Sequence, residues 1–589
     1  MSTASREQGF ALVTALMMMA VLMALLVAYA VRTQVELSST DASLSGLRGF
    51  YAAEAGLNIR AEQIRQTFRG YQRPAGTSPV DPAGVAPCLS GSMGTGHFAC
   101  AGYGIQDRAV HTYVREDAGN PVAIVVPRGE TYQNLSAQEY GYSVFSMALS
   151  PRSRTEAILE MRFKSRLVPL FQFAAFYNKD LEILPGPPMF LEGPVHSNGD
   201  LYLNAGNTLA IDGQVTTAGD LYHGRKNDTS CNGTVSVDDL GTMTAVPGCG
   251  AGGARVQIAQ SDVTAWDGMI QTGLDPIIVP QPEDFDPAPG RLYWDRADIR
   301  VMLDVNLVVP TIQVRTTGNA LDAATTATLA ACGSATTSNS FFNNREAKTI
   351  RMLDVDVRDL LDCMHANALL GAGKGLDDAT EGGLVVYLGV DGPNSAVVNG
   401  YGVRLTNGAD LESTLALAPE IRGLTVVTDQ AVYIQGNYNS VDKKPAAVMA
   451  DSLNILSNNW TDAKSLLALN LRVPDDTTVQ AAFLAGTDTT GGAEGAAGQD
   501  SGQYNGGLEN YPRFHEEWSG RTFTYRGSFV SLNRPRHVNG AWSYGAPVYK
   551  APDRDWRYDT MFNDAANLPP VTPRFVYLKQ DLFVRQFEL

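Results

Sequence analysis

The feature that most constrains this chain is an uncharged apolar segment close to its N-terminus. Phe10–Val31 is a run of 22 residues without a charge, interrupted mildly by Thr14 and Tyr29. A helix of about 20 apolar residues spans the roughly 30 Å hydrocarbon core of a bilayer. We therefore expect a membrane-spanning helix at residues 10–31, preceded by a polar leader at residues 1–9.

The helical pattern continues beyond this segment. Apolar residues recur at steps of three, four or seven, with one gap, at Leu37, Leu44, Leu47, Tyr51, Ala61, Ile64 and Phe68. No proline precedes Pro74, so we expect one helix from about Phe10 to Phe68, roughly 90 Å long at 1.5 Å per residue. A secretory signal peptide and a plain membrane anchor are the alternatives, because Ala28-Tyr29-Ala30 fits an A-x-A cleavage site.

Two short blocks at the start of the chain carry a family resemblance. They are Arg6-Glu-Gln-Gly9-Phe10-Ala-Leu-Val-Thr14 and Ala52-Ala-Glu54-Ala-Gly56-Leu57. With the apolar run between them, they resemble the N-terminal segment of PilX-type minor pilins of type IV pili. The resemblance implies cleavage between Gly9 and Phe10 by prepilin peptidase, methylation of the new N-terminus, and storage in the inner membrane as a single-pass protein. It also implies assembly with other minor and major pilins into a pilus that passes through the periplasm to the cell surface.

One position departs from the pattern of major pilins. Those usually carry glutamate at the fifth mature residue, where it offsets the terminal ammonium of a neighbouring subunit. Here that position is Thr14, which has no charge. A subunit without this glutamate suits a place with no neighbour ahead of it, so the resemblance implies a subunit at or near the pilus tip.

The six cysteines fall into three pairs of sequence neighbours. These are Cys88 with Cys100, Cys231 with Cys249, and Cys332 with Cys363. Six cysteines allow 15 connectivities, and neighbour pairing is the simplest of them. The even count and the absence of any C-x-x-C favour disulfides over zinc ligands, and so an oxidising compartment.

The region after the helix indicates a small β-sheet. Tyr71–Gly104 is rich in proline, glycine and serine and holds the first cysteine pair, so it is interpreted as a stapled loop. Strand-like runs follow at Val122–Val126, Tyr142–Met147 and Ala157–Met161. Residues 70–166 are therefore predicted to be a disulfide loop followed by a pilin-like antiparallel meander.

Internal repetition sets the expectation for the rest. Glu192-Gly-Pro-Val-His-Ser-Asn-Gly-Asp-Leu-Tyr202 recurs 20 residues later as Asp212-Gly-Gln-Val-Thr-Thr-Ala-Gly-Asp-Leu-Tyr222. A weaker pair matches Val427–Val432 to Met449–Asn454 at an offset of 22. Short β-rich repeats with glycine at the corners are typical of a parallel β-solenoid. Residues 167–510 are predicted to form one, with a β-sandwich as the alternative, giving a mainly β protein with one long N-terminal helix.

The repeat places two aspartates, Asp200 and Asp220, at equivalent positions. Stacked about 5 Å apart, two carboxylates repel unless a cation or proton intervenes, so they are a weak calcium candidate. Gly-Asp is also an ordinary turn sequence in which the aspartate bonds the backbone, and this structural role is favoured. No cofactor and no catalytic residue are predicted, because the chain has no H-E-x-x-H, P-loop or G-x-S-x-G motif.

The C-terminal section, residues 511–589, differs in composition. It holds 11 Lys or Arg and 8 Asp or Glu, whereas the whole chain carries a net charge of −17. Basic residues alternate with rings, which can stack on single-stranded bases. The candidate DNA-binding residues are Arg534, Arg536, Trp542, Arg554, Trp556 and Arg557. The alternative, that these rings pack the end of the β domain, is favoured.

Together these patterns predict a non-enzymatic minor pilin that supports pilus assembly, with extracellular DNA as a partner during natural transformation. Its overall architecture looks like that of large competence pilins, in which a pilin fold carries a β-solenoid. Two alternatives remain: a tip pseudopilin of a type II secretion system, and an envelope-anchored β-helix protein that is a carbohydrate-active enzyme or an adhesin. The acidic net charge counts against DNA unless a local basic surface exists.

Overall fold

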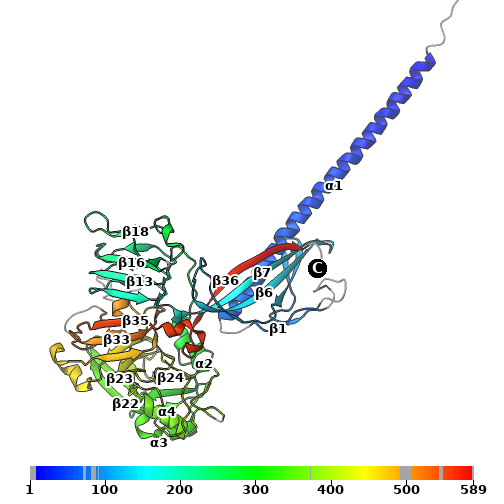
Figure 1. The fold of residues 1–589 in the computed structure, drawn as a ribbon. Helices are drawn as coiled ribbons and strands as arrows, with labels where there is room; N and C mark the ends of the chain where they lie inside the picture. The colour runs from blue at the N-terminus through cyan, green and yellow to red at the C-terminus, as the bar shows by residue number, and fades with distance from the viewer. Residues whose placement is uncertain are drawn as a thin grey trace, which may run out of the picture. The chain divides into compact units, whose positions relative to one another are not determined.

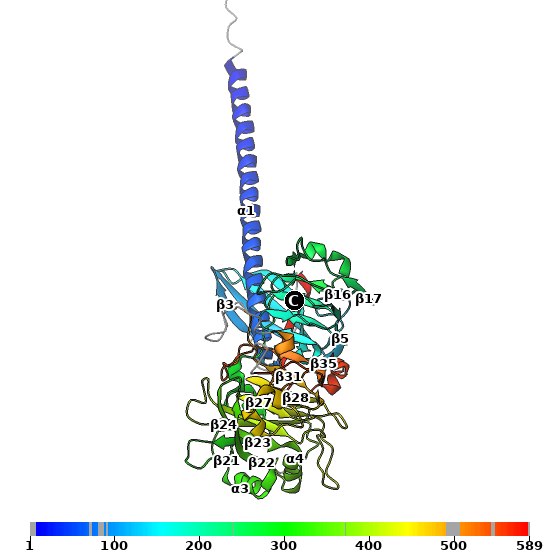
Figure 2. The ribbon, with the colours of Figure 1, turned by 90° about the vertical axis from the view of Figure 1, so that its left-hand side faces the viewer.

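The computed structural model describes residues 8–69, 74–80, 88–89, 92–239, 241–371, 373–490, 507–542 and 548–586. The chain divides into two compact units. The first comprises residues 1–122, 138–166 and 576–589, and the second comprises residues 123–137 and 167–575. Each is mainly β, apart from one long helix at the N-terminus (Figures 1 and 2).

The first unit consists of that helix and an antiparallel sheet. Helix α1 is Gln8–Arg69, and the sheet has the order β3-β4-β6-β7-β36. Its strands are β3 Ala101–Ile105, β4 Arg108–Glu116, β6 Ser136–Leu149, β7 Thr155–Pro169 and β36 Arg574–Gln586, and a separate two-stranded ribbon pairs β1 Gly76–Thr77 with β2 Thr95–Gly96. The last strand of the chain therefore belongs to this sheet, whereas the sequence placed all of residues 511–589 with the second β domain.

The second half of α1 packs on this sheet through small residues. Ala53 and Leu57 are fully buried. A Cβ added at Gly56 would lie 2.6 Å from Val110 Cγ1, and one at Gly49 would lie 2.4 Å from Glu156 Cβ. The two glycines, seven residues apart, thus allow helix and sheet to approach closely. This contact explains the Ala-Glu-Ala-Gly-Leu block in physical terms.

The second unit begins with short parallel strands, most of which are stacked at an interval of 20 residues. Three ladders run through it. The first consists of β8 Ala175–Tyr177, β11 Val195–Ser197, β14 Val215–Thr217 and β19 Ile270–Gln271. The second consists of β9 Leu181–Ile183, β12 Leu201–Leu203 and β15 Leu221–His223, and the third of β10 Met189–Glu192, β13 Thr208–Asp212 and β16 Thr234–Asp239. Val195 pairs with Val215 and Leu201 with Leu221, so the register follows the 20-residue repeat. The same register extends back to Ala175 and Leu181, a further repeat that the sequence did not reveal.

The rest of the second unit forms longer parallel ladders that lead back to this stack of short strands. The main sheet has eleven strands in the order β19-β14-β11-β8-β34-β31-β28-β26-β24-β20-β21. The chain thus starts at β8, moves outward through β19, and comes back from β20 until β34 pairs with β8 (Figure 1). The later strands of this sheet are β20 Ile299–Asp304, β21 Thr311–Val314, β24 Leu384–Asp391, β26 Leu424–Val427, β28 Ala446–Ala450, β31 Ala482–Ala485 and β34 Phe529–Ser531.

The remaining elements complete this unit. A six-stranded sheet contains β22 Thr336–Asn343, β23 Lys348–Asp356, β25 Tyr401–Thr406, β27 Ala431–Gln435, β29 Ser452–Leu456 and β32 Arg513–Phe514. A three-stranded sheet contains β30 Thr477–Gln480, β33 Thr522–Gly527 and β35 Asp553–Tyr558. Others are β5 Val122–Val125 at the passage between the units, β17 Thr242–Ala245, β18 Val256–Ile258, α2 Leu292–Arg296, α3 Ala323–Ala331 and α4 Val357–Ala366. Strand side chains pointing inward form one continuous aliphatic and aromatic core.

All three neighbour disulfides are present. Cys88–Cys100 lies in the first unit, and Cys231–Cys249 and Cys332–Cys363 lie in the second. The third joins the end of α3 to α4, whose N-termini are capped by Asp322 and Asp356. The pairing that the sequence left as one of 15 is therefore the one the structure shows.

Candidate functional site

The N-terminal helix contains the first candidate site. Phe10–Val31 is exposed along its whole length, and α1 is the one described helix that is long and apolar enough to cross a membrane. Thr14 Oγ1 donates to the carbonyl of Phe10 at 2.9 Å, so its hydroxyl is satisfied within the helix. The predicted cleavage point, Gly9–Phe10, lies in the first turn of α1, and leader residues 1–7 lie outside the described residues.

Asp200 and Asp220 stack as the repeat predicts. The backbone N–H of Asp220 donates to Asp200 Oδ1 at 2.9 Å, and the N–H of Asp200 donates to Asp180 Oδ1 at 2.8 Å. The sequence missed Asp180, because Lys179 stands where the other repeats have glycine. The carboxylates of Asp180 and Asp200 thus each hold the turn of the next repeat, which is the structural role favoured above.

Neighbouring side chains stabilise the charge of this ladder. Tyr202 and Tyr222 stack at 4.8 Å between ring centroids and donate to Asp200 and Asp220, and Arg255 covers both rings. Lys226 Nζ lies 2.7 Å from Asp180.

Within the described ranges, the one cluster with metal-ligand geometry is His223 with Cys231 and Cys249. Both of its sulfurs are joined in a disulfide, so neither is available as a thiolate ligand.

The C-terminal candidates for DNA binding occupy two kinds of environment. Trp542 and Trp556 are 2% and 3% exposed, so their rings pack inside the β domain and do not offer a stacking face. Five of the six candidate side chains have partners within the described chain. Arg513 covers Trp542, and Arg554 covers Trp556 and donates to the Glu509 carbonyl. Arg536 pairs with Asp286, and Arg557 lies 3.5 Å from Asp555. Arg534 is half-buried, and no ion pair is found for it in the part of the chain that the structure describes.

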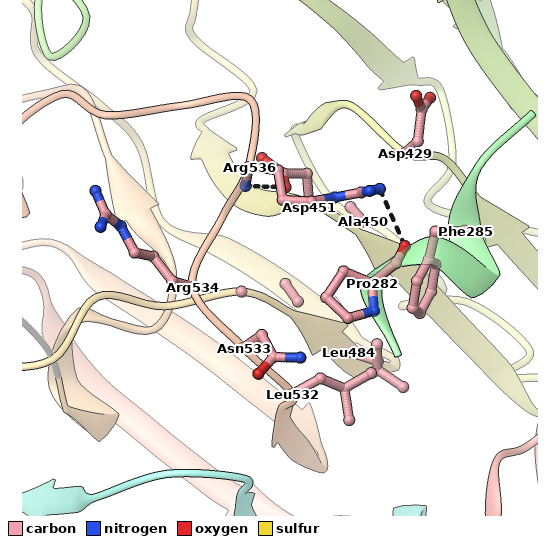
Figure 3. Close-up of a pocket in the computed structure, with 12 residues that line it drawn as sticks. Pro282, Phe285, Asp429, Ala450, Asp451, Leu484, Leu532, Asn533, Arg534 and Arg536 are labelled. Atoms are coloured by element: carbon pink, nitrogen blue, oxygen red, sulfur yellow. Dashed lines mark hydrogen bonds between the residues drawn. The ribbon is translucent and has the colours of Figure 1, made fainter. Parts of the chain in front are cut away.

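A hollow at the turns of the main sheet is a site that the sequence did not predict. Its volume is about 330 Å³, counting space open to solvent, and it is lined by Pro282, Phe285, Asp429, Ala450, Asp451, Leu484, Ala485, Gly486, Leu532, Asn533, Arg534 and Arg536 (Figure 3). Asp429 follows β26, Asp451 follows β28, and Leu532 follows β34, so three strands of the main sheet deliver them to the same corner.

The two carboxylates of this hollow already have donors. Asp451 accepts the backbone N–H groups of Arg536 and His537 at 2.6 and 2.9 Å. Asp429 accepts the Gln430 amide at 2.9 Å, and the Tyr387 hydroxyl lies 3.4 Å from it. Burial raises the pKa of Asp429 to about 6 and also raises the pKa of Asp451. The sequence could not have assembled this site, because Arg536 pairs with Asp286, 250 residues earlier in the chain.

No family model matches the sequence, and no curated protein matches it. Among solved structures, the chain is similar to the competence-associated pilin ComZ from Thermus thermophilus at 13% identity, with 92% of this chain and 97% of that chain covered. The TM-score is 0.27, which is too low to carry a conclusion about fold or function.

Proposed function

We propose that this chain is a minor subunit of a type IV pilus, placed at or near the pilus tip, and not an enzyme. The observation that carries the proposal is the construction of α1. Its first third is apolar and exposed, as a membrane-stored segment requires, and its last third packs on an antiparallel sheet through Gly49 and Gly56. We also propose that the parallel ladders of the second unit form a β-solenoid that the pilin-like unit carries.

Thr14 supports the placement at the tip. Its hydroxyl is satisfied by the carbonyl of Phe10, so the helix needs no charged partner at this position. The carboxylates of the hollow support a non-enzymatic role, since Asp451 is occupied by two backbone donors. A tip pseudopilin of a secretion system shares these features, and genetic linkage to pilus or to secretion genes separates the two.

Processing of the N-terminus tests the proposal. Mass spectrometry of the exported protein should find a chain beginning at methylated Phe10, cut by prepilin peptidase in the inner membrane. Replacing Gly9 with a bulky residue should leave the precursor uncut. A mature chain beginning at Val31 would instead identify a signal peptide and a secreted protein.

DNA capture during transformation is a further proposed role, and it rests on Arg534, for which no ion pair is found among the described residues. Phosphate contacts make affinity fall with salt in proportion to the charges neutralised. Replacing Arg534, Arg536, Arg554 and Arg557 with alanine should weaken binding and flatten that dependence. Arg534→Ala alone is the cleaner test, because the other three arginines also contact partners within the protein, and their replacement can weaken binding through the fold. If the parent shows no salt-sensitive binding, this subunit does not capture DNA.

A further inference from the structure

The segment that follows β34, residues 532–542, is called the strap. It adds no strand, and two carboxylates bind its backbone. Asp451 accepts two consecutive N–H groups, from Arg536 and His537, and Glu346 Oε2 accepts the next pair, from Asn539 and Gly540 at 3.1 and 2.8 Å. The strap thus crosses several turns of the β stack and is fixed at two points.

Side chains of the strap also bind the turns beneath it. Arg536 donates to Asp286 at 2.6 Å and to the Pro282 carbonyl at 3.0 Å. His537 Nδ1 lies 3.0 Å from the Val397 carbonyl, in the turn after β24. Figure 3 shows Arg536 reaching across the hollow toward Pro282, with Asp451 beside its backbone. The strap therefore forms one wall of the hollow.

Ionisable groups of both kinds meet at this wall. Asp286, Asp429 and Asp451 face the strap from three separate parts of the chain, and the strap supplies Arg534, Arg536 and His537. His537 Nε2 lies 4.0 Å from Asp429, and the titratable hydroxyl of Tyr387 on β24 touches the same carboxyl. Asp429 is only 5% exposed. Burial favours a bound proton on Asp429, and this effect outweighs the opposing influence of His537 and Arg536.

We propose that the strap is a pH-dependent latch, which closes over the hollow as the medium becomes mildly acidic and loosens as the pH rises. With the strap closed, burial raises the pKa of Asp429 to about 6, from 3.8 for a hydrated carboxyl. The closed state therefore binds a proton more tightly than the open state. Between these two values a fall in pH favours closure, by at most about 100-fold for a difference of two pKa units.

The two anchors differ, because burial raises the pKa of Asp451 whereas the pKa of Glu346 is lowered. Burial raises the pKa of Glu346, but Arg513 and the two N–H donors outweigh it, so its pKa lies below the ordinary value. Glu346 thus keeps its charge, and its hold on Asn539 and Gly540, to lower pH than Asp429 does. Opening accordingly begins at the Arg536–His537 end, with Gly540 near the pivot.

Hydrogen exchange of the full chain in detergent, from pH 5 to pH 8, tests the latch. After correction for intrinsic rates, protection of the amides of Arg536 and His537 should be highest near pH 5 and fall about tenfold by pH 8. Protection at Asn539, Gly540 and strand β13 should change less. Protection that is constant, or that rises with pH, would overturn the proposal, and this measurement needs no variant.

Asp429→Asn removes the titrating group at nearly constant shape. Its strap should remain protected at pH 8 and lose most of the pH dependence. Asp553→Asn, at an exposed carboxylate of β35, is the matched control and should retain the profile of the parent. If Asp429→Asn also retains that profile, another group controls the strap and the latch is wrong.

Discussion

Asp220 donates its backbone N–H to the side chain of Asp200, which lies one strand away in the stack, at a distance of 2.9 Å. The same bond joins Asp200 to Asp180. Asp180 and Asp200 are therefore acceptors for the turns of the next repeat, so Asp200, half of the weak calcium candidate, has a structural role. The carboxylate on one repeat fixes the backbone of the next.

Asp200→Ala is expected to destabilise the protein by about 1–3 kcal/mol, because it leaves the N–H of Asp220 without its acceptor. Chemical denaturation measures the change. Asp220→Ala is the control, since the Asp220 carboxylate accepts from the Tyr222 hydroxyl and no backbone N–H donor to it is found in the described part of the chain. Equal losses in the two variants would contradict the ladder.

Gly199→Ala tests how closely the repeats approach. A Cβ at this position would lie 2.3 Å from Asp180 Oδ1 and 2.6 Å from the Asp180 backbone nitrogen. We expect a loss of about 1–3 kcal/mol, as for other overpacked sites. A Cβ at Gly186 would meet nothing within 4 Å, so Gly186→Ala should be close to neutral. Thermal melts of both variants and the parent measure the two effects.

The first stack could be predicted from sequence because most of its strands repeat at an interval of 20 residues. Val195, Val215 and their neighbours keep a spacing of 20, so hydrophobic and turn positions align. The later ladder pairs Leu424 with Ala446 and then Phe483 with Phe529, with intervals of 22 and 46 residues, so no period survives in the sequence. Within the weaker predicted repeat, Val427 pairs with Met449 as expected, but Val432 pairs with Leu453 and not with Asn454.

The helix was predictable for a different reason. Apolar length and the absence of proline determine α1 locally, whereas the hollow depends on pairs such as Arg536 with Asp286 that no local pattern records. The sequence also indicated rings interleaved with arginines at Trp542 and Trp556. It could not show that both rings are buried, because burial depends on which strands lie beside them.

The disulfide Cys332–Cys363 closes a loop of 31 residues. On the loop-entropy model, replacing both cysteines with serine should cost roughly 3–4 kcal/mol. Thermal melts of the double variant, with and without reductant, measure the loss. With reductant, the parent and the variant should melt at similar temperatures. The melting temperature of the variant should respond to reductant through its two remaining disulfides alone. A parent that melts at the same temperature in both states would show that the bridge contributes little.

Arg513 and Glu346 form an ion pair at 2.7 Å whose side chains are both fully buried. Arg513→Met should therefore cost about 3–5 kcal/mol at neutral pH, because a buried carboxylate remains without its cation. Arg557→Met, at a pair whose arginine is 56% exposed, should change stability by no more than about 1 kcal/mol. The pKa of Glu346 is lowered in the folded state, so its stabilising contribution is present at neutral pH and is lost as the pH falls below the ordinary glutamate pKa and through the lowered one. Denaturation from pH 3 to pH 7 should show this acid loss in the parent and a shallower one in Arg513→Met, whose neutral Glu346 is tolerated at low pH. If both proteins follow the same pH profile, the pair does not control the acid stability of the fold.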